Sequence, residues 1–447
     1  MLPLALILLL GLLVPVSAAE DAPGLLTMRG AVDPRIQQGI DLIYQLRFEE
    51  ADDYFEHIIE ADPDNPTGHF FLAMVGWWRV LVDLEDRSHD DDLYALLDRC
   101  IAVCDRRLHE DPDDFDAILF KGGAVGFRGR LRGDRHEFVR AARDGLRCLP
   151  LLKKSRQLEP SNKDILFGQG IYNYFAEVIP KRHRMVRPIM MFLDDGDREL
   201  GLQQLEEVAR EGRYARAEAL YFLAQIYRMF EEDDSRALPY LVELHEMYPE
   251  NALFHRYRAR TLVALGRWVE GIGHYEEIAR RSRDNATGYH IRGHIEAVYY
   301  IGKNAFRQRR REAAIGNLAL ADSLASTLGD ASDEQVANGY TALANLYLGM
   351  TYSELGQQDA AVQSYARVLD LPQQGRSHEL ARKYRKEPYA RLCSVMERTL
   401  YSPLPFESGA ILPLAQDFIN DDGGSTRHIE RILVAKDRHL HYCVTTL

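Results

Sequence analysis

The chain has 447 residues, of which 46% are hydrophobic and 28% are charged, a composition typical of a soluble folded protein and not of a disordered or collagen-like chain. Nucleic-acid binding is driven largely by Lys and Arg side chains that neutralise phosphates and release their counterions. The formal net charge of this chain is −13, so no nucleic-acid partner is expected. Length alone suggests about three domains of roughly 150 residues, unless the chain is built from repeats.

The N-terminus carries an apolar run, LALILLLGLLV at residues 4–14, followed by Pro15 and the small residues of VSAA. The run is shorter than the about 20 residues that span a bilayer, which favours a cleavable signal peptide over residues 1–19. Cleavage before Ala19 or Glu20 would give a periplasmic or secreted protein with no transmembrane segment. Because Lys and Arg are missing before the run, an uncleaved anchor or a misassigned start remains the alternative.

The first helical pair is predicted in GIDLIYQLRFEEADDYFEHIIEADPDNP, where Gly39, Ala51, Phe55 and Pro63 stand at characteristic spacings. Small residues let two antiparallel helices approach, and an aromatic ring fills the space between them. The spacing from the small residue to the large apolar residue returns twice, at Ala237 with Leu241 and at Gly271 with Tyr275.

The clearest copy is LGMTYSELGQQDAAVQSYARVLDLP, which has Leu348, Gly349, Tyr352, Ala361 and Tyr365 in fixed order. This segment resembles a tetratricopeptide repeat (TPR), a helix-turn-helix unit of about 34 residues with the pattern W-x2-L-G-x2-Y, A-x3-F and P. The resemblance implies an all-α, TPR-like α-solenoid, a right-handed superhelix of antiparallel helix pairs. We expect about eight pairs and a closing helix in a repeat domain at 33–399, and an irregular C-terminal extension at 400–447.

Three of the five cysteines, Cys100, Cys104 and Cys148, fall at packing positions of second helices. Free cysteine behaves as a small hydrophobic residue, so these are expected to be buried thiols. A disulfide between Cys104 and Cys148 stays possible in an oxidising compartment.

The prolines that end the early repeats, Pro63, Pro112 and Pro160, are farther apart than the about 34 residues of a repeat. The early repeats therefore have longer helices or inserted loops. Residues 83–92, 128–137 and 179–197 are the candidate insertions, and insertions in solenoids gather on one face that often binds partners.

Two basic stretches lie in or beside these candidate insertions, and an aromatic segment lies between them. Guanidinium groups suit carboxylate or phosphate groups, so the stretches predict a surface for an acidic peptide or another anion. The alternative is that the arginines pair with acidic faces of neighbouring helices. The candidate partner-binding residues are Arg128, Arg132, Tyr172, Asn173, Arg182, Arg184 and Arg187.

None of the common hydrolase, metalloprotease, P-loop or dinucleotide motifs occurs. The segment from Asp195 to Glu206 imitates a calcium loop but has Leu200 where the turn needs glycine, and it predicts a helix start instead. No enzyme activity, cofactor or metal is expected. The sequence thus favours an exported, non-catalytic TPR scaffold that binds a protein or peptide in the cell envelope. The alternative is a small-molecule or anion-binding accessory protein of a transport system, and the oligomeric state is left open.

Overall fold

The computed structural model describes residues 26–30, 32–182, 195–329 and 339–390. Within these ranges all regular secondary structure is helical, which confirms the predicted fold class. The helices follow one another as antiparallel pairs and divide into two compact units, residues 1–293 and residues 294–447. None of the described helices is both long and apolar enough to cross a membrane.

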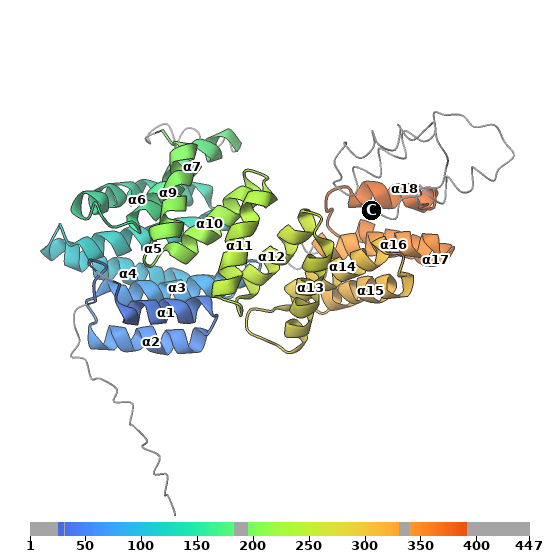
Figure 1. The fold of residues 1–447 in the computed structure, drawn as a ribbon, viewed down its shortest axis with the longest axis horizontal. Coiled ribbons are helices and arrows are strands. Elements are labelled where there is room, and N and C mark those ends of the chain that lie inside the picture. The colour runs from blue at the N-terminus through green and yellow to red at the C-terminus, as the bar shows by residue number, and fades with distance from the viewer. Residues whose placement is uncertain (1–25, 31, 183–194, 330–338, 391–447) are drawn as a thin grey trace, which may run out of the picture. The chain divides into compact units, whose positions relative to one another are not determined.

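The described residues of the first unit form six successive pairs, whose arrangement Figure 1 shows. They are α1 (Pro34–Tyr44) with α2 (Phe48–Ala61), α3 (Pro66–Val82) with α4 (Asp90–Glu110), α5 (Phe115–Asp134) with α6 (Phe138–Leu158), α7 (Ile165–Arg182) with α9 (Arg198–Glu211), α10 (Arg216–Met229) with α11 (Asp234–Met247), and α12 (Ala252–Ala264) with α13 (Trp268–Arg283).

The second unit continues with α14 (Ile291–Arg307), which begins at the boundary, α15 (Arg311–Ser326), α16 (Gly339–Glu354), α17 (Gln358–Asp370) and α18 (Ser377–Lys386). Asp322 on α15 holds this stack together, because it accepts hydrogen bonds from Asn345 on α16 at 2.9 Å and from Arg367 on α17 at 3.2 Å. Helix α18 closes the described part of the unit against α17.

Glycines set the close approach of paired helices. A Cβ atom built on Gly39 would lie 2.3 Å from the ring of Phe55, and one on Gly349 would lie 2.5 Å from the ring of Tyr365. Both rings are fully buried, as is Ala361. The predicted packing roles of Gly349 and Ala361 are therefore confirmed, and the same arrangement closes the first pair and the last one.

A segment before α1, which we call the N-terminal strap (residues 26–30 and 32–33), runs past the turns between successive pairs. The backbone amide of Met28 donates to Asp116 at 2.9 Å, and its carbonyl accepts from Asn162. The carbonyl of Leu26 accepts a hydrogen bond from Asn65 at 3.0 Å. The strap thus joins the beginnings of the second, third and fourth pairs.

The strap and α1 then reach the fifth and sixth pairs. The backbone amide of Asp33 donates to the hydroxyl of Tyr214 at 2.7 Å, just before α10. Asn251, which caps α12, donates to the carbonyl of Tyr44 at 2.9 Å. The ring of Tyr44 also stacks on that of Tyr248, with 5.0 Å between centroids. The first unit therefore closes on itself instead of remaining an open spiral.

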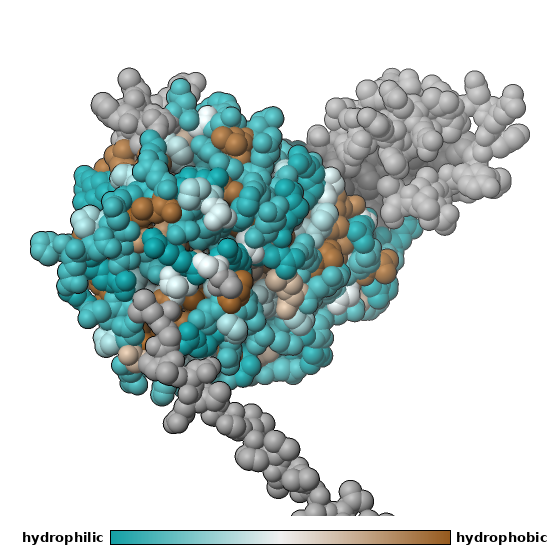
Figure 2. All heavy atoms as spheres, turned by 60° about the vertical axis from the view of Figure 1, so that its left-hand side comes forward, coloured by the Kyte–Doolittle hydropathy of each residue, from teal (hydrophilic) through white to brown (hydrophobic). Residues whose placement is uncertain are grey.

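Aromatic side chains fill the place where the first, second, fifth and sixth pairs meet. Tyr44 and Phe254 lie against Trp78, with ring centroids 5.0 and 5.4 Å away. Inside this cluster, one carboxylate oxygen of Glu218 accepts hydrogen bonds from the indole of Trp78 and the hydroxyl of Tyr44, both at 3.1 Å. By contrast, the face of the first unit that Figure 2 shows is mostly hydrophilic, with small separate apolar patches.

Candidate functional site

The first basic stretch lies on helices. Residues 128–134 belong to α5, so the expected insertion at 128–137 is wrong, and the wide repeat spacing comes from the long helices α5 and α6. Arg128 makes two hydrogen bonds to the fully buried Asp144 of α6, at 2.9 and 3.2 Å, and a third to Asp98 at 2.6 Å. Arg132 also pairs with Asp144. Both guanidinium groups are engaged within the helix stack.

The other candidate residues lie on α7 or beyond it. The amide of Asn173 donates to Gln204 at 2.8 Å, and Tyr172 is half-buried. Arg182 donates to the carbonyls of Met229 and Phe230 at the end of α10, at 3.1 and 2.7 Å. The last carbonyl groups of a helix have no hydrogen-bond partner within the helix, and Arg182 supplies one here. Arg184 and Arg187 lie outside the described residues. The described candidate residues therefore lie in two separate places. Arg128 and Arg132 surround Asp144, and the others lie on α7.

The three described cysteines are free thiols, and the Cys104 to Cys148 disulfide is not formed. Cys100 and Cys104 are both buried on α4, as predicted, whereas Cys148 on α6 is only partly buried. A hydrogen bond to Cys104, together with burial, raises the pKa of the Cys100 thiol well above its ordinary value. The thiol of Cys148 donates to the carbonyl of Gly122 at 3.3 Å.

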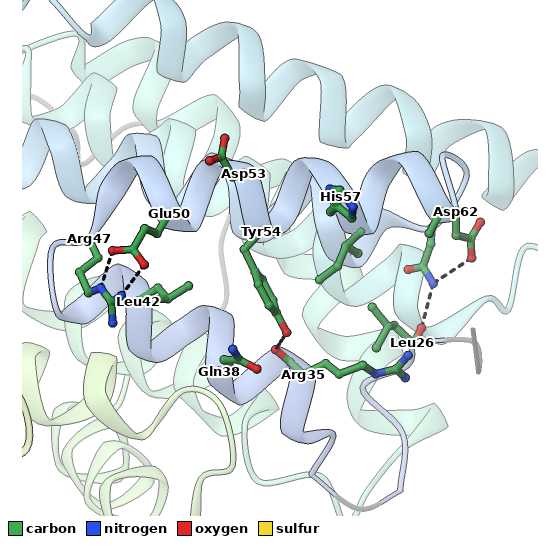
Figure 3. Close-up of a pocket in the computed structure, with 13 residues that line it drawn as sticks. Leu26, Arg35, Gln38, Leu42, Arg47, Glu50, Asp53, Tyr54, His57 and Asp62 are labelled. Atoms are coloured by element: carbon green, nitrogen blue, oxygen red, sulfur yellow. Dashed lines mark hydrogen bonds and ion pairs between the residues drawn. The ribbon is translucent and has the colours of Figure 1, made fainter. Parts of the chain in front are cut away.

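An open groove of about 750 Å³ lies on the outer face of the first pair, and we call it the α1–α2 groove (Figure 3). Helix α3 packs against the same pair, where Gly68 meets both Ile58 and Ile59. The groove is lined by Leu26, Arg35, Gln38, Leu42, Arg47, Glu50, Asp53, Tyr54, His57, Ile58, Ala61, Asp62 and Asn65.

Apolar side chains from both helices line the groove. Leu42 comes from α1 and Ile58 from α2, and each is only partly covered. Tyr54 reaches across from α2, and its hydroxyl donates to the carbonyl of Arg35 at 2.8 Å (Figure 3). This contact holds the two helices at a fixed separation along the groove.

Charged groups line the groove as satisfied pairs. Arg47 donates to both carboxylate oxygens of Glu50, and this pairing holds the pKa of Glu50 below its ordinary value. Arg35 pairs in the same way with Asp33, whose pKa is also lowered. With Asp53 and Asp62, the lining carries more carboxylates than guanidinium groups. The α1–α2 groove therefore combines partly covered apolar side chains with mixed, slightly acidic charged groups.

Sequence reasoning did not find this groove because it follows no motif and because its charges are ordinary for exposed helices. One signal was available. Leu42 and Ile58 each follow Gly39 and Phe55 by three residues, so they lie at the edge of the packed helix faces, where they are only partly covered. Apolar residues at the edge of the terminal pair of a stack indicate a surface that can be covered further.

Among the described residues, one group of three or more His, Cys, Asp or Glu side chains could hold a metal ion. It consists of His245, His255 and His274. The segment from Asp195 to Glu206, which imitates a calcium loop, is a helix start, as its sequence predicts. Asp197 caps α9 by accepting a hydrogen bond from the amide of Leu200 at 2.9 Å.

Comparison with known proteins identifies the class. Two family models described as tetratricopeptide repeat match residues 231–286 and 340–374. Together with the consecutive antiparallel pairs, these matches show that the chain contains tetratricopeptide repeats. No curated protein matches it.

Solved structures resemble the chain weakly, each at 14% sequence identity. A human IFIT1 dimer with PPP-AAAA has a TM-score of 0.39 and covers 75% of this chain and 71% of its own. The C-terminal part of a TPR repeat-containing protein from Cytophaga hutchinsonii has a TM-score of 0.31 and covers 67% and 97%. The TPR domain of P58(IPK) has a TM-score of 0.24 and covers 91% and 99%. Likeness at this level says nothing about function.

Proposed function

We propose that the protein is an exported, non-catalytic scaffold and that its α1–α2 groove receives a helix of a protein partner. The supporting observation is that the partly covered apolar side chains of Leu42 and Ile58 line the same open groove as several charged groups. An amphipathic helix places an apolar stripe into such a groove and leaves its polar side in water.

The stack itself supports a helical occupant. Helix α3 of the chain itself already packs against both α1 and α2. The groove offers a comparable surface between the same two helices. In contrast, the surface of the first pair around Tyr44 is already covered by the chain itself, because Phe254 of α12 stacks on Tyr44 there. The outer face is thus the better docking surface of the first pair.

The groove suits an anionic small molecule less well. Arg35 and Arg47 are both neutralised by adjacent carboxylates, and an anion would have to displace these partners. Glu50, Asp53 and Asp62 would also repel it. Arg128, Arg132 and Arg182 do not line the groove. These charges favour a protein segment over the anion-binding alternative.

Site-specific photo-crosslinking tests the proposal in the full-length protein. A photoreactive residue at position 42 should trap one protein partner in envelope fractions, and I58D should abolish the adduct. Position 269 is the matched control, because Val269 on α13 is 88% exposed and lies outside the groove. Adducts that are identical at both positions, or that survive I58D, would reject the groove as the binding site.

Export is supported by the apolar run at residues 4–14 and the small residues after it. Residues 1–25 lie outside the described part of the chain. N-terminal sequencing of the protein recovered from the envelope should find Ala19 or Glu20 first. Recovery of a chain that still begins at Met1 would contradict cleavage.

A further inference from the structure

Three histidines from three consecutive helices meet in the first unit. His245 lies in the last turn of α11, His255 in the first turn of α12, and His274 on α13. One nitrogen from each ring lies within 4.8 Å of the others. The first of the three, next to Glu246, looks in the sequence like an ordinary solvated helix residue, and no metal motif connects it to the other two.

Two of the rings already stand at a chelating distance. Nε2 of His255 and Nδ1 of His274 are 3.1 Å apart. Tetrahedral zinc with bonds of about 2.0 to 2.1 Å holds its ligand nitrogens about 3.3 Å apart. The two nitrogens can share one proton, and a metal ion placed between them would replace it.

A neighbouring tyrosine orients the central ring. The other nitrogen of His255, Nδ1, lies 3.0 Å from the hydroxyl of Tyr289. A hydroxyl can donate or accept, so it can hold the tautomer in which Nε2 is free for a metal. Outer partners of this kind fix the direction of a metal-binding imidazole.

The third ring supplies an unsatisfied nitrogen. Nδ1 of His245 is buried and has no hydrogen-bond partner. Its ring stacks on that of His255, with 4.5 Å between centroids and 22° between planes. Coordination requires a turn of His245 about its last side-chain torsion, which is a soft one. A buried nitrogen without a partner is costly, and a bound ion would remove that cost.

Charged side chains lie beside the cluster. The positive charge of Arg281 beside the cluster is offset by Glu277 and Glu250, at 2.8 and 2.7 Å.

We propose that His245, His255 and His274 form a binding site for a divalent transition-metal ion of the zinc class. Imidazole ligands suit zinc, copper and nickel, and three protein ligands leave one position for water or for a side chain of a partner. His245 and His274 are only partly covered, so this position is reachable from solvent.

Cobalt(II) binding to the full chain is the test, because tetrahedral cobalt absorbs visible light and zinc displaces it. We expect one cobalt per chain with this absorption, and its loss in H274Q. The matched control is H57Q, since the side chain of His57 is 89% exposed and the residue lies far along the chain on α2. H245Q provides a second ligand variant, and melting without metal verifies that each variant folds.

Two further measurements separate a metal site from a merely structural cluster. Y289F should weaken cobalt binding by about 10 to 100-fold, as loss of an outer partner does. Zinc should raise the melting temperature of the parent and of H57Q, and leave that of H274Q unchanged. If cobalt and zinc do not bind the parent, or bind H274Q and H245Q as well as the parent, the proposal is wrong.

Discussion

Asn251 donates a hydrogen bond to the backbone carbonyl of Tyr44, a residue 207 positions earlier in the chain. The oxygen of the same side chain accepts from the amides of Leu253 and Phe254 and so caps α12. One buried amide group therefore starts the sixth helix pair and fixes it to the end of the first helix.

The N251A variant should lose both roles. Loss of the cap costs about 1 kcal/mol, and leaving a buried carbonyl without its partner costs about 1 to 3 kcal/mol more. D233A is the matched control, because Asp233 caps α11 from an exposed position and makes no such distant bond. Thermal unfolding should show a clearly larger loss for N251A, and equal losses would mean that the bond to Tyr44 contributes nothing.

The D144A variant should strongly destabilise the first unit. Asp144 is fully buried and accepts from both Arg128 and Arg132, so its removal leaves buried positive charge at a cost of about 3 to 5 kcal/mol. E137A removes the exposed partner of Arg140 and should cost less than about 1 kcal/mol. Chemical denaturation of the two variants checks this, and a D144A protein as stable as E137A would refute the structural role.

The G349L variant should destabilise the second unit, because even a Cβ atom there would lie 2.5 Å from the ring of Tyr365. Overpacking of this kind costs about 1 to 3 kcal/mol. G316L in the same unit is the control, since Gly316 is an exposed residue inside α15 with open space around it, and leucine there should gain up to about 0.8 kcal/mol of helix propensity. Melting curves followed by circular dichroism should move in opposite directions.

The E218Q variant tests a pH dependence. Burial raises the pKa of Glu218 above its ordinary value of 4.5, although Arg130 opposes the shift. Ionisation is then easier in the unfolded chain, so Glu218 costs stability as the pH rises from the unfolded pKa through the folded pKa. Glutamine keeps an oxygen for Trp78 and Tyr44 without the charge.

Unfolding experiments should therefore find E218Q more stable than the parent at pH 7, with the difference shrinking toward pH 4. E218A serves as the control, because it removes the acceptor and should be less stable than E218Q at both values. A difference between E218Q and the parent that stays constant with pH would show that Glu218 ionises normally.

Thiol labelling tests the cysteine positions. Cys100 and Cys104 are buried, and the raised pKa of Cys100 keeps it in the unreactive thiol form. In a chain with serine at positions 393 and 443, native protein should label slowly and denatured protein rapidly at three sites. Fast labelling of Cys100 in the native state would contradict its place in the core.

The sequence was sufficient to predict the helix pairs because their packing is local. Gly39 meets Phe55, and Gly349 meets Tyr365, within single repeats, so a fixed spacing along the chain reveals each contact. The helix start in the segment from Asp195 to Glu206 was predictable because its signal is local too.

The closure of the first unit and the candidate sites could not be predicted in this way. Tyr44 and Asn251 show no common spacing, since their contact depends on the accumulated rotation of five pairs. The cluster of His245, His255 and His274 depends on how three helices are turned relative to one another. The partners of Arg128 and Arg132 could not be predicted either, because a dense basic stretch looks the same in sequence whether it pairs with Asp144 or with another molecule.

The N-terminal strap also determines the order in which the first unit can complete its structure. In an open repeat array, each unit contacts only its neighbours and can fold as soon as it leaves the ribosome. Here the first described residues, with Met28 bound to Asp116 and Asn162, bond to segments synthesised much later. The hydrogen bond to the carbonyl of Tyr44 can form only after Asn251 has been synthesised. The last steps of folding therefore join the two ends of the unit, and its six pairs should gain their final stability together.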